Sequence, residues 1–134
     1  MANLRQSADV VDENEESLVF RLCFGSFSML FTADTGFHTE ERMVADKAEL
    51  ASTVLKADHH GSRFSTSELL LGKVSPSVVL ISAGRGNSFG LPARQTIERL
   101  KRRGIKTWRT DLDGTIELTS DGVSWSVATP YRPD

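Results

Sequence analysis

The chain has 134 residues, of which 39% are hydrophobic and 25% charged, and its formal net charge is −2. This composition is that of one ordinary globular domain, and it excludes two separate domains or a low-complexity chain. No stretch approaches the roughly 20 apolar residues that span a bilayer, and the N-terminus lacks a signal-peptide core, so we expect a cytoplasmic chain as given.

The first predicted elements are two strands joined by a tight turn. Residues 17–24 and 26–32 are rich in aromatic and β-branched residues, and Gly25 lies between them, which predicts a β-hairpin. Cys23, the single cysteine, excludes an internal disulfide, and we expect it to be buried in the first strand. Residues 1–13 carry several acids and are predicted to form a flexible segment ahead of the domain at 14–129.

The middle of the chain alternates between helical and strand patterns. Thr39 is a plausible N-cap for a helix over residues 39–48, and acidic side chains follow it in the first turn. Residues 53–57 predict a short buried strand. Ser67 can cap a helical turn over 67–71 that Gly72 would stop.

The second half continues this alternation and ends in strands. The apolar run at 78–82 predicts a strand covered on both faces, and Pro92 and Gly104 would open and close the next helix. Residues 105–110 and 114–119 predict strands about a turn at Asp113, residues 123–127 an edge strand, and 130–134 a loose tail. The order predicts an α/β (α+β) fold.

Two strand-to-loop corners carry side chains suited to chemistry. Asp34 follows the apolar strand that ends near Thr32, and His59 and His60 follow the strand at 53–57. Each corner has a plain alternative: Asp34 can form an Asx-turn or a helix N-cap, and the histidines can simply hydrogen-bond backbone in a polar turn. If the strands are neighbours, one hard oxygen and one or two imidazoles meet, which suits zinc, manganese or iron.

With both corners, the sequence resembles the metallo-β-lactamase superfamily, in particular its ComEC-type DNA-internalisation branch. The resemblance runs from about residue 14 to about residue 125. The Leu-Phe-Thr-Ala-Asp at 30–34 stands where the family usually reads Leu-Leu-Thr-Gly-Asp. The other matching motifs lie at 14–22, 55–62, 77–82, 87–92 and 109–114.

The resemblance implies the C-terminal half of an αββα sandwich, a mixed sheet with helices on one face. It implies that Asp34 bridges two zinc or manganese ions, that His59 is a terminal ligand, and that His60 shares this task or acts as an acid-base group. Ser62 and Asn87 would orient substrate or the metal ligands. His38 matches no family ligand. The implied reaction is hydrolysis of a phosphodiester or acyl bond, with nuclease, phosphodiesterase and lactonase all open.

Two departures from the family pattern bear on activity. The motif His-x-His-x-Asp-His is absent from this sequence, and Leu91 stands where the branch usually has a histidine. Leucine can neither bind a metal nor move a proton. Because three ligands from one half are too few for a closed two-metal site, we expect the isolated chain to be inactive. We expect it to dock on a missing N-terminal half or to form a homodimer, and to be membrane-associated if it is cut from a ComEC-type protein.

A cluster of basic residues suggests a second possibility. Arg99, Lys101, Arg102 and Arg103 lie in one predicted helix and could bind DNA phosphates. The plain alternative is a solvated outer helix face, since Trp108 is the only aromatic residue nearby. The competing functions are therefore a metal-free DNA-binding module, or a structural partner that completes another chain's sandwich.

Overall fold

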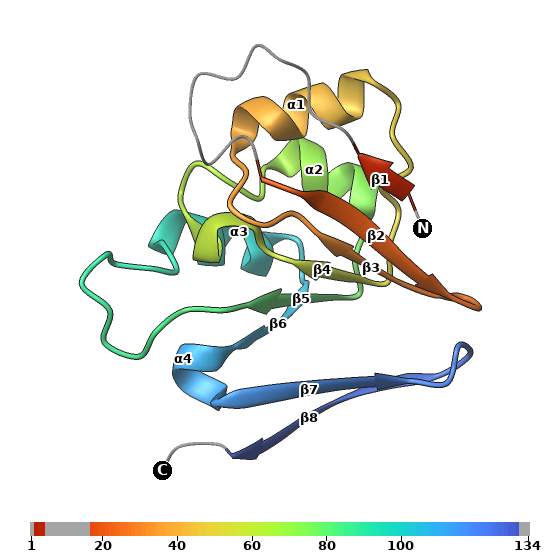
Figure 1. The fold of residues 1–134 in the computed structure, drawn as a ribbon. Coiled ribbons are helices and arrows are strands. Elements are labelled where there is room, and N and C mark those ends of the chain that lie inside the picture. Colours follow the sequence, from red (N-terminus) through yellow and green to blue (C-terminus); the bar gives the residue numbers. More distant parts are fainter. Residues whose placement is uncertain (1, 5–16, 132–134) are drawn as a thin grey trace.

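The computed structural model describes residues 2–4 and 17–131 (Figure 1). Eight strands and five helical segments alternate along these residues. In chain order they are β1 (Ala2–Leu4), β2 (Val19–Phe24), β3 (Phe27–Phe31), α1 (Phe37–Ala45), β4 (Val54–Lys56), the 3-10 helix η2 (Asp58–Gly61), α2 (Glu68–Val74), β5 (Val78–Ile81), α3 (Arg94–Arg102), β6 (Lys106–Arg109), α4 (Thr110–Asp113), β7 (Thr115–Ser120) and β8 (Trp125–Tyr131).

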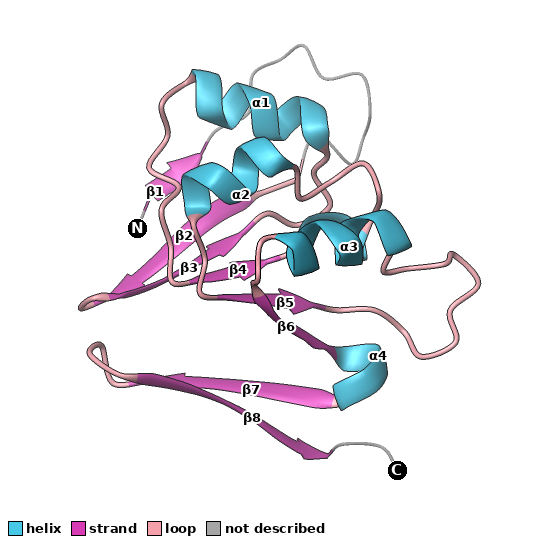
Figure 2. Cartoon of the chain, turned by 180° about the vertical axis from the view of Figure 1, so that it is seen from behind, coloured by secondary structure: helices cyan, strands magenta, loops and turns pink. Residues whose placement is uncertain are grey.

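The main sheet has six strands in the order β1-β2-β3-β4-β5-β6. Strands β1, β2 and β3 pair antiparallel, whereas β3, β4, β5 and β6 are parallel. Helices α1, α2 and α3 connect the parallel strands and lie on one side of the sheet, as Figures 1 and 2 show. The predicted mixed α/β sheet with helices on one face is therefore confirmed. The loops after β3, β4 and β5 consequently gather at one edge of the sheet.

The core between sheet and helices is apolar and almost free of solvent contact. Leu30, Leu55 and Ile81 from the sheet pack against Leu70 and Leu71 of α2, and all five are fully buried. The continuous apolar strand at 78–82 was predicted to be covered on both faces. Every residue of β5 is in fact buried, because the second face of the sheet is covered as well.

The second face is covered by a separate two-stranded sheet. Strands β7 and β8 pair antiparallel and lie on the side opposite the helices (Figure 2). Ile116, Leu118 and Trp125 pack on Met29 and other buried residues of the main sheet, namely Phe27, Val54, Val78 and Leu80. The alternation of half-buried and exposed residues along β7 and β8 follows from having one face on this core.

This cover leaves most of β2 open and reaches it only where the Phe24 ring lies beside Gly122. Phe20, Leu22 and Phe24 stand opposite Phe31, Met29 and Phe27 in the strand register, so they point to the face that carries β7 and β8. Leu22 and Phe24 are nevertheless exposed, as is Leu18 just before the strand. We call Leu18, Phe20, Leu22 and Phe24 the β2 stripe.

Two turns hold the layers together at one end. The Ser26 backbone N–H and hydroxyl both donate to the Gly122 carbonyl, at 2.7 and 3.1 Å. A Cβ on Gly25 would lie 2.2 Å from that carbonyl oxygen, and Gly25 has a φ of +57°. Only glycine fits this contact without displacing the other turn.

Several predicted boundaries are wrong, each for a local reason. Helix α1 begins at Phe37 with Gly36 as N-cap, not at Thr39, because the Phe37 N–H bonds to the Phe64 carbonyl and the chain turns earlier. Helix α2 is capped by the Ser67 side chain as predicted, but it continues through Gly72 to Val74 and ends at Ser75 in a left-handed conformation. Burial of Val74 outweighs the weak helix preference of glycine.

The C-terminal strands also differ from the prediction. The turn expected at Asp113 is the short helix α4, which carries the chain from β6 in the main sheet to β7 in the other layer. Strand β8 runs to Tyr131, so residues 130 and 131 of the predicted tail belong to a strand. Residues 132–134 of that tail lie outside the described residues.

Two expectations concern the N-terminal side. Cys23 is exposed rather than buried, because the far end of β2 projects beyond its pairing with β1. Residues 2–4 of the predicted flexible segment form β1, and residues 5–13 lie outside the described residues.

Candidate metal and substrate site

The two predicted corners meet at the carboxyl edge of the parallel strands. Asp34 lies in the turn after β3, and η2 follows β4, its neighbour in the sheet. The His59 N–H donates to the Ala33 carbonyl at 2.8 Å, which joins the two turns through their backbones. The Asp34 Oδ1 lies 3.5 Å from the His60 Nε2. Of the two adjacent histidines, His60 is therefore the one whose ring faces the carboxylate.

A backbone carbonyl fixes the orientation of the His60 ring. The His60 Nδ1 lies 2.8 Å from the Ser82 carbonyl oxygen, at the end of β5. Because a carbonyl can only accept a hydrogen bond, Nδ1 must carry a proton. In neutral His60 the Nε2 atom is then the ring nitrogen that can coordinate a metal, and it lies 3.5 Å from the Asp34 Oδ1. A metal cation coordinated by both atoms would suit this arrangement.

The separation and accessibility of this pair fit a metal ion. Two ligands of one tetrahedral zinc ion, each about 2.1 Å from it, lie about 3.4 Å apart, and the observed separation is 3.5 Å. The His60 and Asp34 side chains are 48% and 47% exposed, so an ion can reach them. A histidine that donates its other N–H to a carbonyl is a common metal-ligand arrangement.

The donor set is nevertheless short. Among the residues that the structure describes, no group of three or more His, Cys, Asp and Glu side chains could hold a metal ion. The His59 ring is 6.4 Å from the His60 ring between centroids, and its backbone, rather than its ring, contacts the Asp34 turn. His38 is exposed on α1. Asp34 and His60 therefore supply two candidate donors and no third one among the described residues.

The η2 backbone is strained in a way that aims His60. His59 and His60 have φ of 46° and 55°, in the left-handed region that non-glycine residues rarely adopt. Such strain persists only when neighbouring contacts enforce it. Here the fully buried Asp58 supplies these contacts: its carboxylate accepts from the Thr35 hydroxyl at 3.0 Å and the Thr66 hydroxyl at 2.8 Å.

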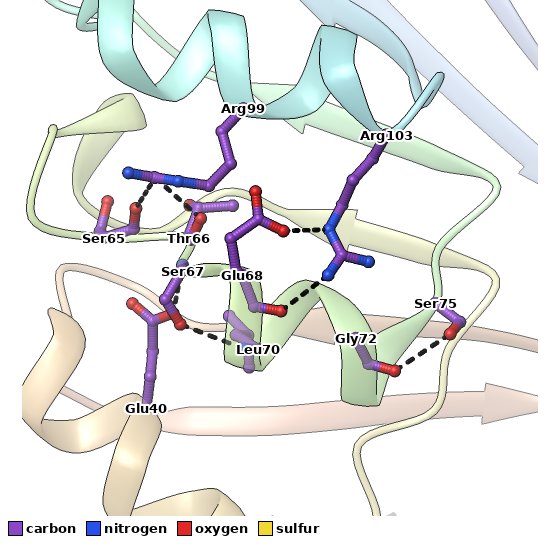
Figure 3. Close-up of polar contacts among 10 residues, drawn as sticks. All are labelled: Glu40, Ser65, Thr66, Ser67, Glu68, Leu70, Gly72, Ser75, Arg99 and Arg103. Atoms are coloured by element: carbon purple, nitrogen blue, oxygen red, sulfur yellow. Dashed lines mark hydrogen bonds and ion pairs between the residues drawn. The ribbon is translucent and has the colours of Figure 1, made fainter.

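A second buried acid stands beside Asp58. Glu40 of α1 accepts from the Ser67 N–H and hydroxyl through Oε1, at 2.7 and 2.8 Å (Figure 3). Its Oε2 is buried and accepts from no donor within the described residues. Burial, followed by the nearby Asp58 charge, raises the pKa of Glu40 to about 8. At neutral pH Glu40 is therefore protonated, and its Oε2 becomes a donor toward Asp58.

No local sequence signal singles out this buried pair. Glu40 is one of the acids in the first turn of the helix predicted at 39–48, and Asp58 lies within the motif at 55–62. Burial also raises the pKa of Asp58, while hydrogen bonds from Thr66 and Thr35 oppose that shift. Lys56, just before the corner, has its pKa lowered by burial, against the nearby Asp58 and Asp34 charges.

The predicted substrate residues mainly hold loops in place. The Asn87 amide donates to the Gly84 and Leu91 carbonyls and accepts from the Phe89 and Leu91 N–H groups. The Ser62 hydroxyl accepts from the Phe64 N–H. Asn87 also lines, with His60 and Leu91, a cavity of about 270 Å³ whose remaining lining residues are Ala83, Gly84 and Phe89.

The predicted basic face divides into two kinds of residue. Arg99 donates to the Ser65 and Thr66 carbonyls, both at 3.0 Å, and Arg103 pairs with the Glu68 carboxylate at 2.5 Å and bonds the Glu68 carbonyl (Figure 3). These two arginines tie α3 to the loop after η2 and to α2. Lys101 and Arg102 are exposed and remain candidates for binding an anion.

The fold and this site define a mixed α/β domain with a carboxylate-imidazole pair at the carboxyl edge of its parallel strands. The chain matches no protein-family profile. It is 32% identical to ComE operon protein 3 of Bacillus subtilis over 94% of its length, 36% identical to competence protein ComA of Neisseria gonorrhoeae over 81%, and 34% identical to recombination protein 2 of Haemophilus influenzae over 79%.

The chain is therefore similar to one segment of each of these three proteins. The aligned region covers 16%, 16% and 13% of those three relatives, so the chain corresponds to a small part of each. Within the part of the chain that the structure describes, no helix is both long and apolar enough to cross a bilayer.

Proposed function

We propose that this chain is a metal-dependent, hydrolase-like domain of a competence protein that acts on a phosphodiester substrate. The observation that carries the proposal is the Asp34-His60 pair, whose 3.5 Å separation suits a shared cation and whose imidazole ring is oriented by the Ser82 carbonyl. The competence names of the relatives support nucleic acid as the substrate.

In this proposal Asp34 and His60 bind zinc or manganese, and Asn87 holds the loop beside them. A bound ion of this kind supplies a water molecule activated as a nucleophile. The further ligands that a closed site needs come from outside this sequence, where a His-x-His-x-Asp-His segment is the expected source. Leu91 lines the cavity next to His60 and contributes an apolar wall instead of a ligand.

Zinc titration of the chain tests the pair directly. We expect the zinc affinity to fall more than about tenfold in Asp34→Asn and in His60→Gln, because each removes one of two ligands. Calorimetry and the NMR signals of the histidine rings measure this affinity. His38→Gln is the matched control and should bind like the parent chain. Equal zinc affinity in all four proteins would contradict the site.

Hydrolysis is a separate test. With Mn²⁺ present, we expect the chain alone to leave bis(4-nitrophenyl) phosphate intact, and to hydrolyse it when a second polypeptide carrying the His-x-His-x-Asp-His segment is added. Asp34→Asn should abolish that turnover. If the two polypeptides bind each other and no turnover appears, the catalytic part of the proposal is wrong.

A metal-free interaction module is the second candidate function. The short donor set and the exposed β2 stripe favour it, since an uncovered apolar face next to a buried one is typical of a surface that another chain or segment covers. Absence of zinc binding, together with partner binding through the β2 stripe, would favour this function over hydrolysis.

A further inference from the structure

A second cavity opens beside the one that contains His60. It has a volume of about 410 Å³, within the range of sites that accept small organic groups. Phe89 and Leu91 line both cavities, so the second one lies next to the cavity that His60 lines. No function considered so far uses it.

Phe89 is the unusual residue of this cavity. Phe89 is 82% exposed, although exposure of a phenyl ring to water is unfavourable in free energy. The loop that carries it is not loosely held, because the four Asn87 side-chain hydrogen bonds include one from the Phe89 N–H itself. A fixed loop thus presents an aromatic ring to solvent between the two cavities.

The rest of the cavity combines another aromatic ring with positive charge. Phe64 is 59% exposed, and its ring is held edge-to-face by Phe37 and covered by the Arg63 guanidinium at 4.5 Å. Arg94 also lines the cavity, where it pairs with Glu98. The remaining lining residues are Ser62, Gly90, Ala93 and Gln95, so the lining carries two cations and no acid.

Exposed aromatic rings beside arginines are what single-stranded nucleic acids bind. Bases stack on the rings, and guanidinium groups contact the phosphates. In a duplex the faces of the bases are already stacked on one another, so a ring such as Phe89 can be used only by an unpaired base.

We propose that the cavity lined by Phe64 and Phe89 is a nucleobase-stacking subsite for single-stranded nucleic acid. One base stacks on Phe89, Arg63 and Arg94 contact flanking phosphates, and the strand continues past Leu91 toward Asp34 and His60. The inference rests on the proposed function only in taking a nucleic acid as the ligand.

The test is fluorescence anisotropy of a labelled 12-nucleotide single-stranded DNA with the full chain, in excess EDTA. Phe89→Ala should weaken binding roughly tenfold, since stacking on one aromatic ring contributes about that much, and Phe89→Trp should restore it. Arg63→Gln and Arg94→Gln should each reduce the slope of the logarithm of the affinity against the logarithm of the salt concentration by about one, the value for one phosphate contact. Phe24→Ala, at the opposite end of the strands, is the control and should bind like the parent.

Two outcomes would overturn the subsite: unchanged affinity in Phe89→Ala, or equal binding of single strand and duplex. Because the assay contains EDTA, it measures binding of the strand in the absence of metal. Failure of the subsite is therefore distinguishable from failure of the metal site, which the zinc titration measures.

Discussion

At the scale of single residues, the η2 backbone that carries His60 is supported by a buried acid pair, Glu40 and Asp58. Glu40 and Asp58 are both fully buried, and a protonated Glu40 can donate to Asp58. Asp58 in turn holds Thr35 and Thr66, which frame the strained η2 backbone. The pair thus links the core beneath α1 to the orientation of His60.

The raised pKa of Glu40 predicts a pH-dependent stability. Between its ordinary value of 4.5 and its value of about 8 in the folded chain, the folded state binds more protons than the unfolded state. The free energy of unfolding should therefore fall as the pH rises through this range, by up to about 1.4 kcal/mol per pH unit from Glu40. Urea denaturation at pH 5.5, 6.5 and 7.5 measures this slope.

Glu40→Gln separates this effect from packing. The glutamine carbonyl can accept the two Ser67 hydrogen bonds, and its amide can donate to Asp58 as a protonated glutamate does. We expect a flatter pH profile and higher stability than the parent at pH 7.5. Glu40→Ala should be less stable at every pH, because it leaves the Ser67 N–H unpaired. A Glu40→Gln profile as steep as that of the parent would show that Glu40 is ionised in the folded chain.

At the scale of elements, Arg99 and Arg103, the two ends of the basic stretch, hold α3 in place. Arg99 donates to two carbonyls of the loop that leads from η2 to α2. We expect Arg99→Ala to destabilise the fold by about 1.5–3 kcal/mol, because it breaks charge-assisted hydrogen bonds and leaves those carbonyls without this donor.

Arg102→Ala is the matched control, since Arg102 is exposed on the same helix. Its unfolding free energy should lie within about 0.5 kcal/mol of the parent value. Chemical denaturation of the two variants compares them. If Arg99→Ala were as stable as Arg102→Ala, the ties between α3 and the loop would not contribute to stability.

The elements also show what the sequence could and could not predict. The hairpin, the Ser67 cap and the helix between Pro92 and Gly104 were predictable because each depends on neighbours a few residues away. The pairing of β6 with β5, and the transfer of β7 to a second layer, depend on contacts across the whole domain. The meeting of the Asp34 and His60 corners followed from strand adjacency, whereas the choice of His60 over His59 depended on η2 dihedral angles that no local pattern encodes.

At the scale of the whole molecule, the β2 stripe is the part of the sheet that the second layer leaves uncovered. Leu18 and Phe24 are more than half exposed, beside the buried cluster of Phe27 and Met29. We expect the chain to self-associate through this stripe at high concentration, because contiguous apolar surface promotes association. Leu22→Lys should make it monomeric in sedimentation velocity, while Leu69→Lys, at an exposed position of α2, should not.

The contact between the turns at Gly25 and Gly122 has a consequence for the order of folding. Ser26 and Gly122 are separated by 96 positions, so their contact forms only after nearly all the intervening chain has folded. The β7-β8 hairpin would then dock last. A methyl group at Gly25 would therefore mainly affect the step in which this hairpin detaches from the main sheet. Gly25→Ala should accelerate unfolding far more than it slows refolding, a pattern that stopped-flow kinetics can resolve.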